Sequence, residues 1–245
     1  TGFQDTELGT LPVDWKVETC GNFSDPVRGG SPRPAGDPRY FNGSYIPWLT
    51  VASLTNISEA EMFVTKTEGF LTEEGSRFSR TLETGTLIIA NSGATLGVAK
   101  ILGVKCCAND GIAALLNLRR DISPLYLVHY INTKTKYLRE VVATGNGQPN
   151  LNTQLIGALK FPLPPSKVEQ EAIANALCDV DALIDSLEKL ISKKHLVKKG
   201  AMQLLLTGKR RLPGFKAPWR RVQLGKLGAW TGGMTPSMQN PLYWD

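Results

Sequence analysis

The sequence predicts an α+β fold, with a mixed α/β domain followed by a long helix of the coiled-coil type. Short apolar, β-branched runs alternate with Gly and Asn turns through the first half of the chain. A sustained heptad pattern follows them, and the start of the chain recurs near its end. We therefore expect the mixed domain over residues 1–160, the helix region over residues 161–208, and a linker with the start of a second domain over residues 209–245.

The recurrence has an offset of 204 residues, the difference between Trp219 and Trp15. At this offset Trp15, Gly21, Gly29 and Pro32 match Trp219, Gly225, Gly233 and Pro236, while Lys16 and Ser31 have the conservative partners Arg220 and Thr235. After a slip of one residue, Pro38, Tyr40 and Phe41 match Pro241, Tyr243 and Trp244. A repeat this long indicates a whole domain plus a spacer rather than a solenoid unit.

Apolar runs bounded by turns mark the strands of the first domain. We expect strands at residues 46–51, 86–91, 98–102 and 112–118, and an extended segment at residues 159–165. The Gly- and Pro-rich residues 29–38 are predicted as a loop, and the polar residues 55–85 as loops with short elements. Cys106 and Cys107 are expected in a strand, with their side chains on opposite faces.

Two helices have clear start signals. Ser123 before Pro124 predicts a helix that begins there and runs to about Thr133. Ser166 and Glu169 have the spacing of a capping box and open the long helix, which Gly208 ends.

The long helix carries an apolar seam in alternating steps of four and three, which is a heptad pattern. The seam residues are Ile173, Leu177, Val180, Ile184, Leu187 and Ile191, flanked by the row Leu183, Leu190, Val197 and Leu204. At about 1.5 Å per residue the helix is roughly 60 Å long, more than one domain needs. We expect the seam to pair with another long helix; the alternative is a core helix packed on its own domain.

Charge is distributed unevenly along the chain. Residues 189–226 hold twelve Lys or Arg and no Asp or Glu, whereas the other 207 residues hold 16 basic and 22 acidic side chains, a balance of −6. Lys and Arg suit the carboxyl end of a helix, but twelve exceed what capping requires. The segment therefore predicts a polyanion nearby.

Catalytic and metal-binding patterns are missing from the sequence. The four cysteines have no C-x-x-C spacing, and the two histidines form no metal-ligand motif. No Gly-rich phosphate loop or nucleophilic triad is recognisable. We expect no catalytic centre and no metal, with reduced thiols in a cytoplasmic protein. The longest apolar runs are too short to cross a bilayer, so no membrane partner is expected.

Basic side chains on loops, interleaved with aromatic residues, point to duplex DNA. Arginine addresses guanine in a groove, although for any single one of these residues an ordinary surface cation is the favoured interpretation. The candidate DNA-binding residues are Arg28, Arg33, Arg39, Lys66, Arg77, Arg80, Ser92, Lys198 and Lys199.

Several motifs in order resemble the specificity (S) subunit of type I restriction–modification enzymes. They are Leu11-Pro12-Val13-Asp14-Trp15, Arg28-Gly29-Gly30-Ser31-Pro32, Tyr45-Ile46-Pro47-Trp48, Asn91-Ser92-Gly93-Ala94-Thr95-Leu96-Gly97, Gln148-Pro149-Asn150-Leu151, and Phe161-Pro162-Leu163-Pro164-Pro165 with Glu169-Gln170. The exit from the long helix, Lys199-Gly200-Ala201-Met202-Gln203 to Gly208-Lys209-Arg210-Arg211-Leu212-Pro213-Gly214-Phe215, looks like that family's as well.

The resemblance implies a target recognition domain, followed by a spacer helix that acts as part of a ruler between two half-sites on DNA. It also implies methyltransferase (M) and restriction (R) subunits as partners, with S-adenosylmethionine, ATP and Mg on those partners and no cofactor on this chain. A full member carries two recognition domains, so this chain is expected to act as a homodimer or pseudo-dimer through its helix.

Two other interpretations stay open at this point. The chain could be a piece of a fused methyltransferase or nuclease that carries its own recognition domain. It could also be a helical assembly scaffold that dimerises without binding DNA.

Overall fold

The computed structural model describes residues 2–93, 95–143, 150–239 and 243. The chain divides into two compact units, Thr1–Glu188 and Lys189–Asp245. The motif residues Ala94, Gln148 and Pro149, and the repeat residues Pro241 and Trp244, lie outside the described residues.

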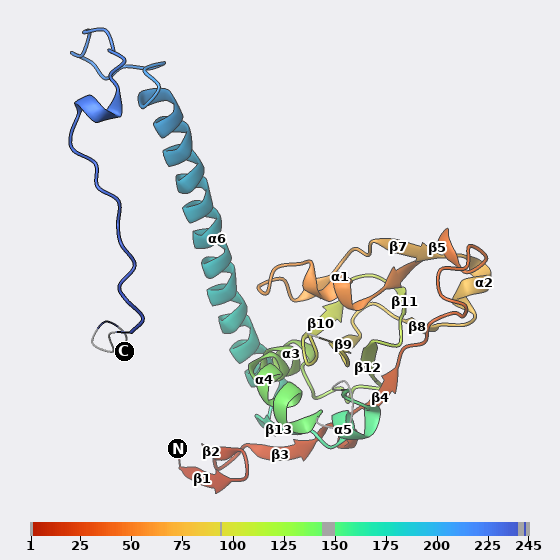
Figure 1. The fold of residues 1–245 in the computed structure, drawn as a ribbon. Coiled ribbons are helices and arrows are strands. Elements are labelled where there is room, and N and C mark those ends of the chain that lie inside the picture. Colours follow the sequence, from red (N-terminus) through yellow and green to blue (C-terminus); the bar gives the residue numbers. More distant parts are fainter. Residues whose placement is uncertain (1, 94, 144–149, 240–242, 244–245) are drawn as a thin grey trace. The chain divides into compact units, whose positions relative to one another are not determined.

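Two sheets form the body of the first unit (Figure 1). The five-stranded sheet has the order β4 (Asp25–Arg28), β12 (Ile112–Leu116), β9 (Leu87–Ala90), β10 (Ala99–Leu102) and β6 (Phe63–Val64). The four-stranded sheet has the order β7 (Gly69–Leu71), β5 (Phe41–Leu49), β11 (Cys106–Ala108) and β8 (Arg80–Leu82). The pairs β10–β6 and β11–β5 are parallel and the others are antiparallel.

The central strand β9 is buried on both faces, which explains its continuous apolar sequence. Leu87 and Ile89 belong to one hydrophobic cluster, while Ile88 and Ala90 belong to another. Cys106 and Cys107 divide in the same way between two clusters, as the period of two requires. The strand expected at residues 86–91 and the opposite-facing cysteines are thus confirmed.

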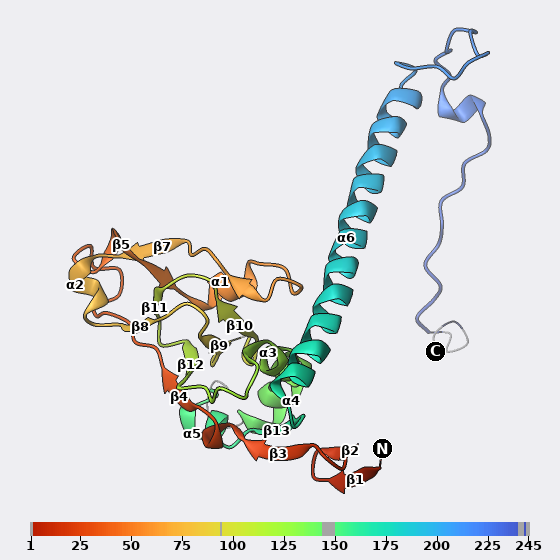
Figure 2. The same ribbon diagram turned by 180° about the vertical axis from the view of Figure 1, so that it is seen from behind.

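The start and the end of the domain lie side by side. β1 (Phe3–Thr6) and β2 (Gly9–Pro12) form a hairpin, and β3 (Lys16–Thr19) pairs antiparallel with β13 (Lys160–Leu163), beside it in both views (Figures 1 and 2). The strands before residue 40 were not predicted from the sequence. They are short, and β3 and β4 pair with residues far along the chain, so local patterns carry little signal for them.

The remaining short elements are helical. They are η1 (Cys20–Asn22), α1 (Val51–Thr55), α2 (Glu73–Ser76), α3 (Pro124–Thr133), α4 (Thr135–Tyr137), η2 (Leu138–Val142), α5 (Thr153–Gly157) and η3 (Leu224–Lys226). The 3₁₀ helices η1 and η3 start at Cys20 and Leu224, which differ by the repeat offset of 204 residues. The two copies of the repeat therefore share local structure, while a second domain stays a prediction.

Three predicted boundaries need correction or confirmation. The strand expected at residues 46–51 is longer at its start and ends at Leu49, because Thr50 and Ser53 form a capping box that opens α1. The strand expected at residues 112–118 ends at Leu116, since Asn117 has a left-handed φ of 51°. The helix predicted from Ser123 is confirmed: its hydroxyl accepts from the Tyr126 amide at 3.4 Å.

The long helix α6 (Lys167–Leu205) is also confirmed. The Ser166 hydroxyl accepts a hydrogen bond from the Glu169 amide at 3.2 Å, as the capping motif predicted. The helix ends before Gly208, which has a φ of +70°. Gln170 joins the start of α6 to the domain: its amide accepts from the Ser123 N–H at 2.8 Å and donates to the Pro164 carbonyl at 3.2 Å.

The buried His129 on α3 should make the free energy of unfolding depend on pH. Burial lowers its pKa below the usual 6.5, an effect that Asp181 opposes. The unfolded chain then takes up a proton first, so stability is full above about pH 6.5 and falls as the pH drops toward the folded-state pKa. Thermal unfolding of wild type from neutral to mildly acidic pH should show this fall, and His129→Gln should reduce it. The exposed His195 provides the control His195→Gln, which should leave the dependence unchanged.

Candidate nucleic-acid interface

Three of the predicted arginines gather around the turn at Asp110. Arg28 Nε donates to the Asp110 carbonyl at 2.6 Å, and Arg33 Nη2 lies 3.4 Å from Asp110 Oδ2. Arg80 Nε donates to the Arg28 carbonyl at 2.8 Å. The Ser31 hydroxyl donates to Asp110 Oδ1 at 2.7 Å, which together with the nearby Arg28 and Arg33 charges holds the pKa of this carboxyl below its usual range. We call these residues the Asp110 cluster.

Gly29 makes this cluster possible. Its amide donates to the Ile112 carbonyl at 2.8 Å, so the loop after β4 runs directly against the turn after β11. A Cβ atom at this position would lie 2.0 Å from the Asn109 carbonyl oxygen. The close main-chain approach therefore requires glycine.

Gly29→Ala should cost about 3 kcal/mol of unfolding free energy or more, because two main-chain segments must separate. Gly69→Ala is the control, since a Cβ atom there meets nothing within 4 Å. Denaturant unfolding of both variants measures the difference. Equal stability of the two would show that the loop can move aside without loss.

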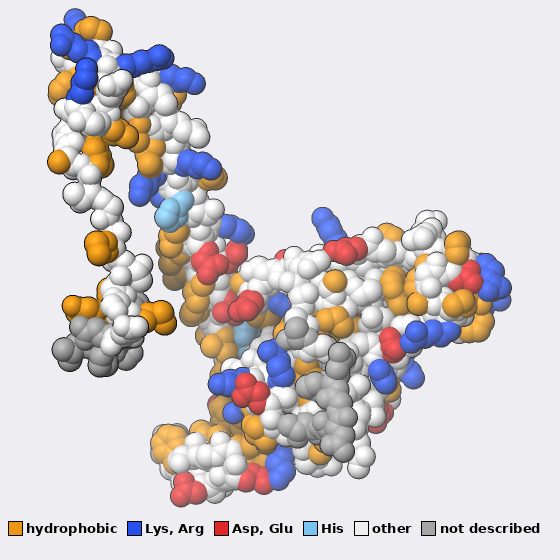
Figure 3. Space-filling view, in the orientation of Figure 1, with side chains coloured by type: hydrophobic (Ala, Val, Ile, Leu, Met, Phe, Trp, Pro, Cys, Tyr) orange, Lys and Arg blue, Asp and Glu red, His pale blue; other side chains and the backbone are white. Residues whose placement is uncertain are grey.

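Arg39 and Arg77 form a second group of arginines and line a hollow of about 600 Å³ beside α2. Arg39 is held by Asp37, with Nη2 to Oδ2 at 2.7 Å, and its guanidinium lies 5.2 Å from the centroid of the Tyr40 ring. Arg77 pairs with Glu73 at 3.0 Å. Blue side chains gather at this end of the domain in Figure 3. We call these residues the α2 cluster.

The two clusters are adjacent because residues 78–79 join them. The Ser79 hydroxyl donates to the Ala108 carbonyl at 3.1 Å, and the position of a Cβ on Gly30 is 3.6 Å from the Phe78 carbonyl oxygen. Arg77 and Arg80 thus stand on either side of one short segment.

The other candidates lie elsewhere. Ser92 bridges to Asn150 and is 3.4 Å from the Cβ position of Gly111, so it borders the Asp110 cluster. Lys66 is exposed in the turn between β6 and β7. Lys198 and Lys199 are exposed on the part of α6 that belongs to the second unit.

This arrangement suits contact with a polyanion. The side chains of Arg33, Arg39 and Arg77 are 71%, 64% and 71% exposed, and each is oriented by a neighbouring carboxylate. Oriented guanidinium groups with free N–H donors can bind phosphate oxygens or guanine edges. Asp110 and Ser31, which organise the first cluster, were not among the predicted site residues, because only basic side chains and Ser92 were selected as candidates for DNA binding.

One described cluster combines Cys, His and Asp. His129 Nε2 is 3.3 Å from Cys178 Sγ, and His129 Nδ1 is 3.9 Å from Asp181 Oδ2. Burial and the two nearby aspartates raise the pKa of the Cys178 thiol, so it stays protonated. A nucleophilic cysteine needs the opposite shift. Within the described residues no group of His, Cys, Asp and Glu could hold a metal ion, and no described helix could cross a membrane.

Comparison with known proteins decides the family. The model of the type I restriction modification DNA specificity domain matches residues 12–194, most of the chain. The chain belongs to this family. The resemblance inferred from the sequence motifs is thereby confirmed.

Curated relatives and solved structures agree. The MjaIX specificity subunit of a type I restriction enzyme from Methanocaldococcus jannaschii is 28% identical over 208 residues, covering 83% of this chain and 46% of the relative. The MjaVIII specificity subunit from the same organism is 26% identical, covering 80% of this chain and 43% of the relative. This chain therefore spans less than half the length of these relatives.

The solved structures support the predicted fold class. The HsdS subunit from Thermoanaerobacter tengcongensis aligns with a TM-score of 0.58 at 19% identity, covering 77% of this chain and 42% of that one. A chain from a structure concerning complex assembly and conformational transition of the type I R-M system has a TM-score of 0.63 at 19% identity, covering 79% of this chain and 45% of that one. A mixed α/β domain followed by a long helix is thus the fold of this chain.

Proposed function

We propose that this specificity domain is a non-catalytic reader of one half of a bipartite DNA sequence. The observation that carries the proposal is the pair of adjacent arginine clusters, whose exposed guanidinium groups are oriented by Asp110, Asp37 and Glu73. The specificity subunits among its relatives support the same function. Methyltransferase and restriction subunits would supply catalysis, together with S-adenosylmethionine, ATP and Mg, in the cytoplasm.

The second part of the proposal is that α6 pairs with the α6 of a second copy. Five of the six seam residues are half-exposed: Leu177 44%, Val180 53%, Ile184 49%, Leu187 48% and Ile191 57%. The sixth, Ile173, packs against the core of its own domain. A half-exposed apolar stripe of this length is typical of an interface.

The charge of α6 favours an antiparallel pair. Residues 167–188 hold one Lys and six Asp or Glu, a balance of −5, whereas residues 189–205 hold five Lys and no acid, a balance of +5. Parallel helices would place like charges together, and antiparallel helices place opposite charges together. The exposed apolar stripe from Leu177 to Leu204 has its midpoint near Leu190, close to where the charge changes sign. A two-fold axis near Leu190 therefore satisfies both patterns.

Selection of duplexes from a randomised pool by the purified chain tests the reading function. We expect enrichment of one short sequence, and an affinity that falls steeply with salt as phosphate contacts release counterions. Equal enrichment of all sequences would reject sequence reading. A chain that dimerises but binds no DNA would instead support the scaffold interpretation.

A further inference from the structure

A cavity of about 810 Å³ opens between α3, α6 and the loop of residues 57–62, all within the first unit. On the side of α6 it is lined by Leu177 and Val180. Both residues belong to the apolar seam, so the cavity and the seam form one continuous apolar surface. A partner that covers the seam at Leu177 and Val180 therefore also contacts the loop of residues 57–62.

The loop of residues 57–62 is held firmly by Lys100 on β10, a lysine that is only 2% exposed. Lys100 Nζ donates to the carbonyl oxygens of Ser58, Glu59 and Glu61 at 3.0, 3.1 and 2.6 Å. The Ser58 hydroxyl also donates to Asp185 Oδ1 on α6 at 3.4 Å. The main chain of the loop is therefore fixed to the sheet, and the side chains of Glu59 and Glu61 remain exposed.

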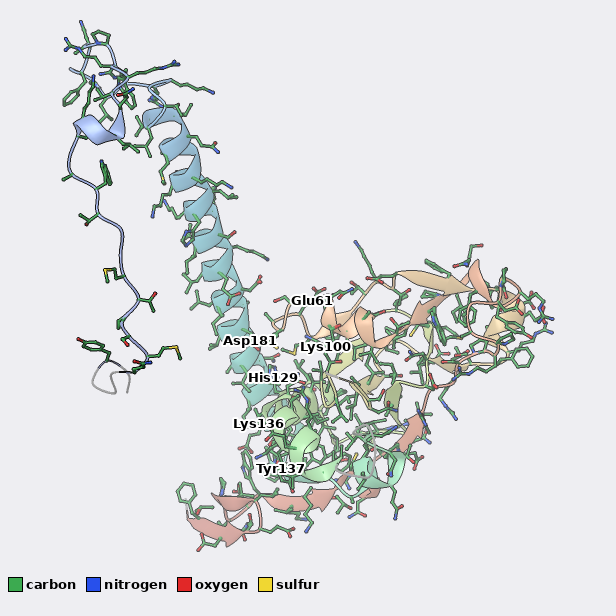
Figure 4. The ribbon with its side chains drawn as sticks, viewed as in Figure 1. Glu61, Lys100, His129, Lys136, Tyr137 and Asp181 are labelled. Carbon is green, nitrogen blue, oxygen red and sulfur yellow. The ribbon has the colours of Figure 1, made fainter. Side chains whose placement is uncertain are left out.

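Acidic side chains lie on the side of the cavity where the loop faces α6, whereas Arg139 lines another part of it. Glu59 and Glu61 from the loop stand near Asp181 of α6, and all three influence the charge on Lys100. Figure 4 shows Glu61, Lys100, His129 and Asp181 gathered from the loop, β10, α3 and α6. An apolar surface with carboxylates on the side of the loop fits a helix that carries an apolar stripe flanked by lysines.

The carboxyl-terminal half of α6 in a second copy has that chemistry. It holds the exposed apolar residues Leu190, Val197 and Leu204, together with the five lysines 189, 193, 194, 198 and 199. With the two-fold axis near Leu190, Asp181 lies nine residues before the axis and Lys199 nine residues after it, so these two meet. The lysine-rich stretch of the partner then passes the loop.

We propose that the loop of residues 57–62, held in place by Lys100, forms part of the helix-pairing site. The loop binds the lysine-rich half of the partner's α6. Each recognition domain thus contacts the α6 of the other copy as well as its own α6. This inference rests on the proposed pairing of α6 and adds a contact between the domain and the partner helix.

The test compares dimer dissociation constants of the full chain without DNA, by sedimentation equilibrium at two salt concentrations. In Glu59→Gln with Glu61→Gln, the carbonyl oxygens that Lys100 binds are retained, so the loop keeps its anchor. We expect the dimer to persist, with a dissociation constant that is roughly tenfold higher and depends less on salt concentration. Asp14→Asn with Glu83→Gln removes two exposed carboxylates that lie outside the loop and outside both arginine clusters, so it is the matched control and should behave as wild type.

A charge swap makes the test specific. Glu59→Lys with Glu61→Lys should weaken the dimer further, and addition of Lys198→Glu with Lys199→Glu should restore it in part. Amide exchange of wild type gives a second readout, with protection of residues 57–62 on dimerisation. If wild type dimerises but the loop variants match it in affinity and salt dependence, the proposed contact of the loop with the partner's α6 is wrong while helix pairing stands. If wild type is monomeric, the pairing itself is wrong.

Discussion

Replacing Ile184 and Leu187 with Asp is expected to abolish dimerisation of the chain. Both side chains are about half-exposed on α6, so an interface there would bury the remaining apolar surface. Full burial of such a side chain contributes about 1.5–3 kcal/mol, and each copy supplies both residues. The double variant loses this contribution and places four carboxylates, two from each copy, in an apolar contact. Light scattering coupled to size exclusion measures the mass directly.

The control places the same charges on another face of the same helix. Ala182→Asp with Ser186→Asp also adds two carboxylates to each copy, and both positions are exposed and off the seam. This control should remain a dimer. Circular dichroism should show the same helix content in both variants. A dimer that survives the Ile184 and Leu187 changes would rule out the seam as the interface.

Replacing Arg28 and Arg33 with Gln is expected to remove most of the preference for the selected DNA sequence. Each bidentate arginine contact to a guanine contributes about 1–3 kcal/mol of discrimination, so two such contacts give roughly 30-fold or more. Phosphate contacts would behave differently: affinity would fall for every sequence alike, and the salt slope would decrease by about one for each phosphate that is no longer neutralised. Anisotropy titrations with the selected duplex and a scrambled one, at several salt concentrations, separate the two cases.

Arg120→Gln is the matched control, because Arg120 is exposed on the same domain and lies outside both arginine clusters. Arg28 also donates to the Asp110 carbonyl, so thermal unfolding must show that the turn is intact. Arg28→Lys offers a milder variant that keeps the charge. Unchanged affinity and selectivity in the double Gln variant would remove the Asp110 cluster from the DNA interface.

Local signals explain which elements could be predicted. The Ser123–Pro124 cap, the Ser166 and Glu169 spacing and the heptad steps of α6 each depend on neighbours within one or two turns. The strand β9 was recognisable because a strand buried on both faces is apolar throughout. The strands β3 and β4 pair with residues more than 80 positions away, and β1 and β2 are short, so no strand was predicted there from the sequence alone.

The candidate site divides in the same way. Residue types and loop positions were enough to single out the arginines, and the heptad spacing was enough to place Leu177 to Ile191 on one stripe of α6. The gathering of Arg28, Arg33 and Arg80 at Asp110 needed the fold, because Asp110 lies 82 residues from Arg28 and reaches it only through the close approach at Gly29. The clamp of Lys100 on residues 58–61 likewise joins segments about 40 positions apart. Periodicity and capping depend on residues that are close in the sequence, so they could be predicted from the sequence. Contacts between distant loops form only when the sheets pair, so only the tertiary structure determines them.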